Sequence, residues 1–173
     1  SRGLGDVYKR QITACMPVVT YARQIGATKE QLCRALIVSD LVTILQKSGI
    51  GRLSAYCGAI SAGVGAGAGI CYLLGGGYSA VAHTVVNAVA ILSGTICDGA
   101  KPSCAFRMFV ALFGALEAMM MAEKGIRATN VEGFVHDDLK VTLENIYRLQ
   151  HDVLHNKVDA ILWDIVKEQK TIH

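Results

Sequence analysis

The chain has 173 residues, which is enough for one ordinary domain with a hydrophobic core. It is 52% hydrophobic and only 18% charged, with a mean hydropathy of +0.38. Its net charge of +3 is too small, and its basic residues are too scattered, to indicate nucleic-acid binding. We therefore expect a large buried core and no nucleic-acid partner.

Residues 1–11 form a polar, basic stretch without a helical or strand period. We interpret them as a non-native leader and exclude them from the predicted fold. The first predicted helix then runs from Ile12 to about Ile25. A second begins after Thr28, which pairs with Gln31 in a capping box, and we expect Gly49 to end it.

Glycines recur through residues 58–74, and such small residues let neighbouring backbones approach closely. The string GVGAGAG could be mistaken for a nucleotide-binding loop. It follows no predicted strand and lacks the GK[ST] ending, so we interpret it as a surface for helix packing. Residues 55–74 also approach the length of a membrane span. Five glycines interrupt them and no aromatic belt or positive cluster flanks them, which favours a buried core over a membrane.

Two apolar helices are predicted next, over residues 79–96 and 103–124, and both are apolar almost all round, as buried helices are. Charged residues return after residue 125. We expect Asp137 or Asp138 to begin an amphipathic helix and Asn156 to begin a last one. The predicted fold class is therefore all-α, a bundle of buried Gly-rich and apolar helices flanked by amphipathic helices.

Three of the six cysteines stand in a pattern that indicates a metal centre. Cys57 precedes the glycine-rich run, whereas Cys97 and Cys104 bracket the turn CDGAKPSC, which contains Gly99 and Pro102. Three thiolates can bind zinc, copper(I) or an iron-sulfur cluster and leave one coordination position open. Cys57 and Cys104 fall near predicted helix N-termini, where the helix dipole favours a thiolate.

The other three cysteines, Cys15, Cys33 and Cys71, fall in helical, apolar settings, where a free cysteine behaves as a small hydrophobe. The chain shows no secretory signal, and its cysteine spacing is not that of a small disulfide-stapled scaffold. We therefore expect reduced thiols and a cytoplasmic protein.

Two strings carry a resemblance to a known family. KSGIGRLSAYCGAISAGVGAGAGICYLLGG, from Lys47, and SGTICDGAKPSCAFRM, from Ser93, resemble the C-terminal region of the L-cysteine desulfidases. That family is related to the alpha chain of bacterial iron-sulfur L-serine dehydratase. The resemblance covers residues 16–124 and weakens beyond them. It implies that residues 12–173 are the C-terminal part of a serine dehydratase alpha-like catalytic domain.

The resemblance also implies a cofactor and a reaction. Cys57, Cys97 and Cys104 match the three cysteines that hold a 4Fe-4S cluster whose fourth iron is free. The implied enzyme is an iron-sulfur lyase that eliminates sulfide from L-cysteine, giving pyruvate, ammonia and hydrogen sulfide. Serine dehydratases have a longer gap between their second and third cysteines than the seven positions found here, which points to the desulfidase branch.

The resemblance also implies a further catalytic cysteine in an N-terminal region, which we expect to lie outside these 173 residues. The expected partners are therefore a small amino-acid substrate and the missing N-terminal region of the same chain, together with a second copy in a homo-oligomer. The fragment alone is expected to hold the cluster ligands without completing the reaction.

Several neighbouring residues are predicted to serve the site. His83 and Asn87 lie four residues apart on one helical face, and Lys101 stands between two of the cysteines. We predict catalytic roles for these three. The predicted substrate-binding residues are Arg52, Ser54 and Asp98, of which Asp98 could also orient Lys101.

Other interpretations of the sequence stay open. The chain could belong to an L-serine dehydratase, or it could be a non-catalytic, membrane-associated helical protein in which the glycines serve close association. A zinc site is a third interpretation of the cysteines.

Overall fold

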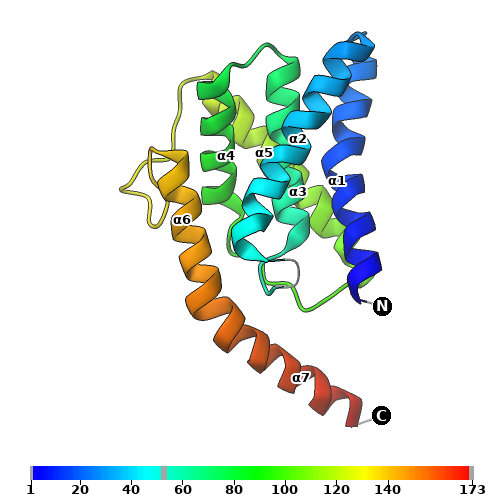
Figure 1. Cartoon of the computed structure of the whole chain (residues 1–173), viewed down its shortest axis with the longest axis vertical. Coiled ribbons are helices and arrows are strands. Elements are labelled where there is room, and N and C mark those ends of the chain that lie inside the picture. Colours follow the sequence, from blue (N-terminus) through cyan, green and yellow to red (C-terminus); the bar gives the residue numbers. More distant parts are fainter. Residues whose placement is uncertain (1, 52–53, 172–173) are drawn as a thin grey trace.

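The computed structural model describes residues 2–51 and 54–171, with the side chains of residues 9–51 and 54–169. Helices pack side by side, and the last of them extends away from the rest (Figure 1). The helices are α1 (Arg2–Gln24), α2 (Lys29–Ile50), α3 (Gly58–Leu73), α4 (Tyr78–Leu92), α5 (Cys104–Glu123), α6 (Leu139–Leu149), the π-helix η1 (Gln150–Val158) and α7 (Asp159–Thr171). The prediction of an all-α fold is confirmed.

Helix α3 forms the centre of the bundle. It contacts α1, α2, α4 and α5, and every residue from Gly58 to Cys71 is buried. The glycine-rich run is therefore a core helix, as the packing interpretation predicted. At 16 residues it is also shorter than a typical membrane span.

The α3 glycines bring two neighbouring helices unusually close. A Cβ atom at Gly63 would lie 2.7 Å from the Cβ of Ala111 in α5, and one at Gly67 would lie 2.9 Å from the Cβ of Ala115. On another face of α3, a Cβ at Gly69 would lie 2.9 Å from the carbonyl oxygen of Ala35 in α2. Only hydrogen atoms fit at these positions, so the glycines set the spacing of the bundle.

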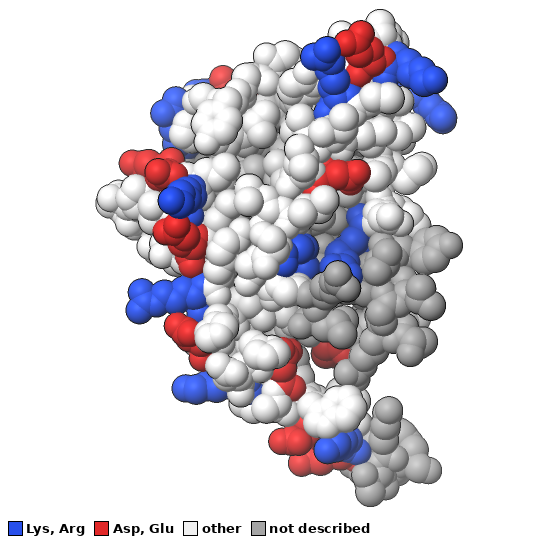
Figure 2. All heavy atoms as spheres, viewed as in Figure 1, with Lys and Arg blue, Asp and Glu red and all other residues white. Residues whose placement is uncertain are grey.

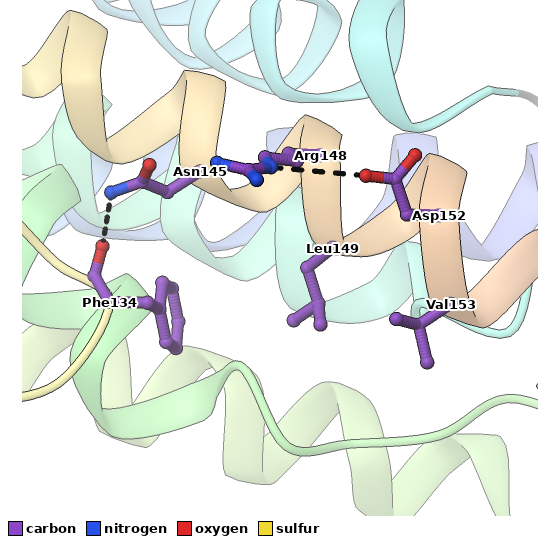
Figure 3. Close-up of a pocket in the computed structure, with 6 residues that line it drawn as sticks. All are labelled: Phe134, Asn145, Arg148, Leu149, Asp152 and Val153. Atoms are coloured by element: carbon purple, nitrogen blue, oxygen red, sulfur yellow. Dashed lines mark hydrogen bonds and ion pairs between the residues drawn. The ribbon is translucent and has the colours of Figure 1, made fainter.

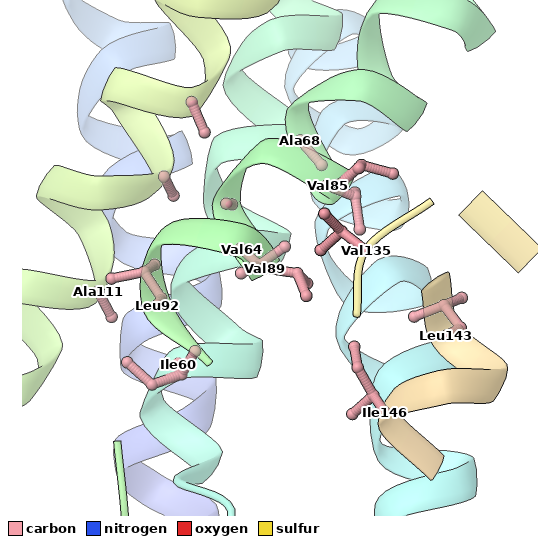
Figure 4. Packing of buried hydrophobic residues seen from close by; sticks show 14 of the residues in the cluster. Ile60, Val64, Ala68, Val85, Val89, Leu92, Ala111, Val135, Leu143 and Ile146 are labelled. Atoms are coloured by element: carbon pink, nitrogen blue, oxygen red, sulfur yellow. The ribbon is translucent and has the colours of Figure 1, made fainter. Parts of the chain in front are cut away.

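The largest hydrophobic cluster joins α3, α4, α5 and α6 (Figure 4). Ile60 and Val64 of α3 pack with Val89 of α4, and Ile146 of α6 covers one side. Burying each such side chain fully contributes roughly 1.5–3 kcal/mol relative to leaving it exposed. This cluster fixes the end of α3 that carries the first cysteine.

Helix α1 begins earlier than the sequence predicted. Residues 2–11 continue the helix that was expected to start at Ile12, and it ends at Gln24. Two contacts hold the later part of this stretch: Lys9 Nζ donates to the carbonyl oxygen of Lys101 at 3.1 Å, and the side chain of Arg10 packs beside Gly58. Their assignment as a non-native leader stays a prediction.

The start of α2 matches the prediction and its end does not. Thr28 and Gln31 form both hydrogen bonds of the capping box. The helix runs through Gly49 to Ile50, and Gly51, with φ of +87°, ends it. Gly49 instead lets the ring of Tyr147 in α6 pack directly on the α2 backbone. This contact docks α6 against α2.

Helices α4 and α5 are each shorter than predicted. Helix α4 ends at Leu92, four residues before Ile96, which adopts an extended conformation and pairs with Tyr56 in an isolated β-bridge. Helix α5 begins at Cys104 and ends at Glu123. It is buried on one face only, so the expectation that it is buried all round was wrong.

The C-terminal part departs most from the prediction. Asp138 does begin α6, because its carboxylate accepts a hydrogen bond from the Lys140 amide at 2.7 Å. Asn156 begins no helix, since η1 continues unbroken into α7 and the Asn156 side chain donates to the carbonyl oxygen of His151 instead. The segment η1–α7 extends away from the rest of the bundle as an arm (Figure 1), so α7 does not cover the core helices.

Candidate metal centre

A short pairing of two loops brings distant cysteines together. The amide of Cys97 donates to the carbonyl oxygen of Ala55 at 2.6 Å, and the amide of Cys57 donates to that of Thr95 at 3.3 Å. These bonds flank the bridge between Tyr56 and Ile96. The forty residues between the two cysteines form α3 and α4, which pack as antiparallel neighbours and return the chain to its starting end.

The third cysteine joins them through one carbonyl group. The thiols of Cys97 and Cys104 lie 4.0 and 3.9 Å from the carbonyl oxygen of Gly99. Gly99 has φ of +114°, a conformation that side chains disfavour, which explains a glycine in this turn. Because Cys97 also hydrogen-bonds Cys57, the three predicted ligands converge on one end of the bundle.

The surroundings of Cys57 favour its thiolate. A hydrogen bond from Cys97 is the largest cause that lowers the pKa of Cys57, to about 6, and burial opposes it. The backbone amides of Ala59 and Ile60, at the N-terminus of α3, and the positive charge of Arg107 lower the pKa further. A thiolate is the form that binds metals, so the lowered pKa would suit a metal ligand at Cys57.

Lys101 and Asp98 form an ion pair in the turn between Cys97 and Cys104. The contact with Lys101 is the main reason that the pKa of Asp98 is lowered. The Lys101 amide also points at the sulfur of Cys104, 3.4 Å away. This arrangement matches the expectation that Asp98 orients Lys101; their roles toward a substrate stay predictions.

Arg107 is a site residue that the sequence analysis did not single out. It lies one helical turn after Cys104, and its Nη1 donates to the carbonyl oxygen of Ile96 at 2.7 Å. Its charge lowers the pKa values of both Cys57 and Asp98. The i, i+3 spacing from Cys104 could have indicated it, because residues at this spacing share a helix face.

His83 and Asn87 are not brought to the cysteines. Asn87 donates to the carbonyl oxygen of Ala118 at 3.3 Å, and Ala118 lies fourteen residues beyond Cys104 in α5. At 1.5 Å of rise per residue, this places Asn87 about 21 Å along α5 from that ligand. His83 is one turn farther from the cysteine end of α4. Catalytic roles at this site therefore gain no support from the geometry.

Asn87 has a clear structural role instead. It is buried, and it also donates to the carbonyl oxygen of Ile126 at 3.0 Å and accepts from the amide of Ala128 at 2.7 Å. These bonds fasten the segment after α5 onto α4. Burial, with the nearby charge of Arg127, lowers the pKa of His83, which favours its neutral form.

Two of the predicted substrate-binding residues, Ser54 and Asp98, lie in the part of the chain that the structure describes, and the third does not. Ser54 precedes the bridge and donates to the carbonyl oxygen of Tyr56 at 3.3 Å, which places it three residues from Cys57. Arg52 lies outside the described residues.

Of the three cysteines expected to be structural, Cys71 is buried, Cys15 is half-buried and Cys33 is exposed.

The candidate donor set consists of three thiols with two cationic side chains near them. Among the described residues, no three histidine, cysteine, aspartate or glutamate side chains lie close enough to hold a single ion. Three converging thiols, a favoured thiolate at Cys57 and the nearby cations Lys101 and Arg107 suit an anionic iron-sulfur cluster.

One cavity of about 420 Å³ is lined by the loop before α6 and by α6 and η1 (Figure 3). Phe134 and residues of α6 and η1 line it, and the ion pair between Arg148 and Asp152, with 3.9 Å between nitrogen and oxygen, crosses its upper side. None of the three cysteines is among the residues that line it.

Residues 11–162 match the serine dehydratase alpha chain family. The chain belongs to this family. A UPF0597 protein of Desulfitobacterium hafniense is 49% identical over 135 residues, covering 78% of this chain and 31% of that protein. UPF0597 proteins of Lachnoclostridium phytofermentans and Bacteroides thetaiotaomicron are 40% and 41% identical, covering 87% and 90% of this chain.

The chain spans about a third of the length of each of these relatives. It covers 31% of the first and 36% of each of the other two. The names of these relatives state no activity. No solved structure matches the chain. The family membership fits the resemblance noted from the cysteine strings, whereas the choice of cysteine over serine as substrate stays a prediction.

Proposed function

We propose that Cys57, Cys97 and Cys104 bind a 4Fe-4S cluster in a lyase that eliminates sulfide from L-cysteine. The observation that carries the proposal is the convergence of these three thiols around one β-bridge and the carbonyl group of Gly99. Membership of the serine dehydratase alpha chain family supports a lyase. The seven-position gap between the second and third cysteines favours cysteine as the substrate.

When bound, the cluster supplies a Lewis-acidic iron that three thiolates leave free to contact the substrate. The chain's own residues hold and balance it. The lowered pKa of Cys57 keeps this ligand deprotonated near neutral pH, and Arg107 ties the loop before Cys97 to the first turn of α5. The positive charges of Arg107 and Lys101 offset the negative charge that a cluster brings.

Lys101 is the residue best placed to meet the substrate carboxylate. Its side chain is 37% exposed and is held by Asp98, so its ammonium group stays at the mouth of the cysteine turn. An ammonium group can pair with a carboxylate as a point charge. We propose that Lys101 binds the amino-acid carboxylate and that Asp98 sets the direction of its side chain.

The proposed reaction balances as L-cysteine plus water giving pyruvate, ammonia and hydrogen sulfide. A base removes the α-proton, the bond from the β-carbon to sulfur breaks, and sulfide leaves with the electron pair. The resulting aminoacrylate takes a proton at carbon and hydrolyses to pyruvate and ammonia. We propose that the base lies in the part of the longer polypeptide that this chain does not span.

Anaerobic reconstitution with iron and sulfide tests the cluster. The expected result is brown protein with visible charge-transfer absorbance and stoichiometric acid-labile sulfide, lost in Cys97→Ser and Cys104→Ser. Cys33→Ser is the matched control, because Cys33 is exposed and distant in sequence from all three ligands. Colourless protein under full iron supply would overturn the proposal, and zinc without sulfide would establish the zinc alternative.

The substrate is tested separately in the full-length protein. Pyruvate formation is measured with L-cysteine and with L-serine, alongside sulfide release from L-cysteine. A higher kcat/KM for L-cysteine is expected. A preference for L-serine would leave the cluster assignment intact and identify the protein as an L-serine dehydratase.

A further inference from the structure

Helix α5 carries a row of exposed aromatic side chains. Phe106, Phe109 and Phe113 are 75%, 67% and 64% exposed, and the rings of Phe109 and Phe113 stack with centroids 6.3 Å apart. Val110 and Met120 extend the row along the helix. We refer to these five residues as the α5 row.

The α5 row exposes more contiguous apolar surface than most helices on the outside of a globular protein. Phenylalanine side chains bury roughly 150–250 Å² each when covered. Three that are each about two-thirds exposed therefore form an apolar patch of several hundred Å², the size that often marks an interaction surface. Glu117 is the one charged residue among the exposed positions of α5 from 105 to 120. A second helix shows the same pattern, since Ile37, Leu41 and Ile44 of α2 are all more than half exposed. The face that includes α2 carries few charges over its centre (Figure 2).

We propose that the α5 row is an internal interface, covered by the part of the longer polypeptide that the relatives possess and this chain does not span. The relatives are about three times as long as the matched segment, which provides enough chain to cover more than one face of the bundle. The proposal goes beyond the lyase assignment and does not depend on the substrate.

The position of the row supports this occupant. Phe106 follows Cys104 by two residues, so whatever covers the row also stands beside the candidate metal centre. Coverage by the remaining polypeptide would limit access of water to the cysteines and bring further residues to them. If a second copy covered the α5 row, or if nothing covered it, the rest of the polypeptide could not approach the cysteines from this side.

A lipid bilayer is the other environment that an apolar helix can occupy. Among the described residues, α5 is the helix long and apolar enough to cross a membrane. However, its other face is packed into the bundle, where Gly114 fits against Leu92 and Ala111 fits against Gly63. Crossing a membrane would require breaking these contacts and displacing Cys104, so a protein occupant agrees better with the packing.

The test uses the full-length polypeptide recovered from the complete reading frame. A photo-crosslinking phenylalanine analogue is placed at position 113, and the crosslinked peptides are identified by mass spectrometry. The expected partner peptide lies in the same polypeptide outside the present 173 residues. The matched control is the analogue at Val131, which is 85% exposed in a loop and is expected to give no such product.

Stability provides a second readout. Phe113→Asp is expected to lower the Tm of the full-length protein by several degrees, whereas Val131→Asp leaves it unchanged. A free surface would tolerate both substitutions equally, and that result would overturn the proposal. Crosslinking at position 113 to a second copy or to lipid would also overturn it, as would a complete reading frame that adds no further chain. The crosslinking and Tm measurements do not depend on lyase activity, so failure of the proposed function would leave both of them interpretable.

Discussion

The side chain of Cys97 hydrogen-bonds the sulfur of Cys57, and this contact is the largest cause of the lowered pKa of Cys57. It joins two residues that are forty positions apart in the sequence. The same two loops are held by main-chain bonds on either side of the Tyr56–Ile96 bridge. The lowered pKa of Cys57 is therefore a property of the folded chain, and we expect it to return toward 9.0 when the loops separate.

A pH titration of metal-free protein checks this relationship. The pKa of Cys57 falls from an ordinary value of 9.0 to about 6, so the thiolate form stabilises the fold. This contribution is fully present above about pH 9 and is lost as pH falls through about 6. Thiolate absorbance in the ultraviolet should show a transition near pH 6 that Cys57→Ser removes. Cys97→Ala should move it to higher pH, and an unmoved transition would contradict the role of Cys97.

The ion pair in the turn makes a separate prediction. Because Lys101 is the main cause of the lowered pKa of Asp98, Lys101→Met should raise that pKa toward 3.8, the ordinary value. The depressed pKa stabilises the fold above the unfolded value, and this stabilisation is lost as pH falls through the folded value. Nuclear magnetic resonance of the Asp98 carboxyl carbon measures the shift. Lys124→Met, outside the turn, is the control and should leave the Asp98 pKa unchanged.

Asn87 provides a test that separates structure from catalysis. Asn87→Ala leaves the buried amide of Ala128 without its acceptor, which costs about 1–3 kcal/mol in the free energy of unfolding. Denaturant unfolding measures the loss. In reconstituted full-length protein, kcat per folded molecule should stay near the parent value, because Asn87 lies far along α5 from the cysteines. A large fall in kcat without loss of stability would instead restore the catalytic prediction.

Features of the site that depend on residues close together in the sequence were predicted better than those that depend on contacts between distant segments. The turn that brings Cys97 and Cys104 together was predicted because CDGAKPSC is a local signal, and the capping box of Thr28 was predicted for the same reason. That Cys57, Cys97 and Cys104 bind a cluster stays a prediction. His83 and Asn87 share a helical face as expected. That face points to the segment after α5, a long-range packing relationship that spacing within one helix cannot reveal.

The fold shows the same difference between local signals and tertiary contacts. Helix type followed from apolar periodicity, whereas helix ends were missed where a tertiary contact replaced the local signal. Gly49 is a helix-ending residue by local rules, but here it accommodates the ring of Tyr147. The exposed side of α5 was missed because apolar residues surround the helix, and a pattern without a polar face cannot say which side meets the bundle.

The α3 glycines allow a prediction whose sign distinguishes two effects. Gly63→Ala should stabilise an isolated helix by up to about 1 kcal/mol, because alanine has the higher helix propensity. In the protein, the new Cβ would lie 2.7 Å from the Cβ of Ala111 and 2.8 Å from its backbone carbonyl carbon. Overpacking of this kind costs typically about 1–3 kcal/mol, so we expect net destabilisation in denaturant unfolding.

Gly94→Ala is the matched control, because no heavy atom lies within 4 Å of a Cβ built there. Its free energy of unfolding should change by less than about 0.5 kcal/mol, as at ordinary surface positions. Adding Ala111→Gly to Gly63→Ala removes one of the two clashing groups and should recover part of the loss. Since the backbone of Ala111 stays in place, recovery should be incomplete. Full recovery would mean that the side chain alone sets the separation of α3 and α5, and a stabilised Gly63→Ala variant would mean that the two helices are not in close contact.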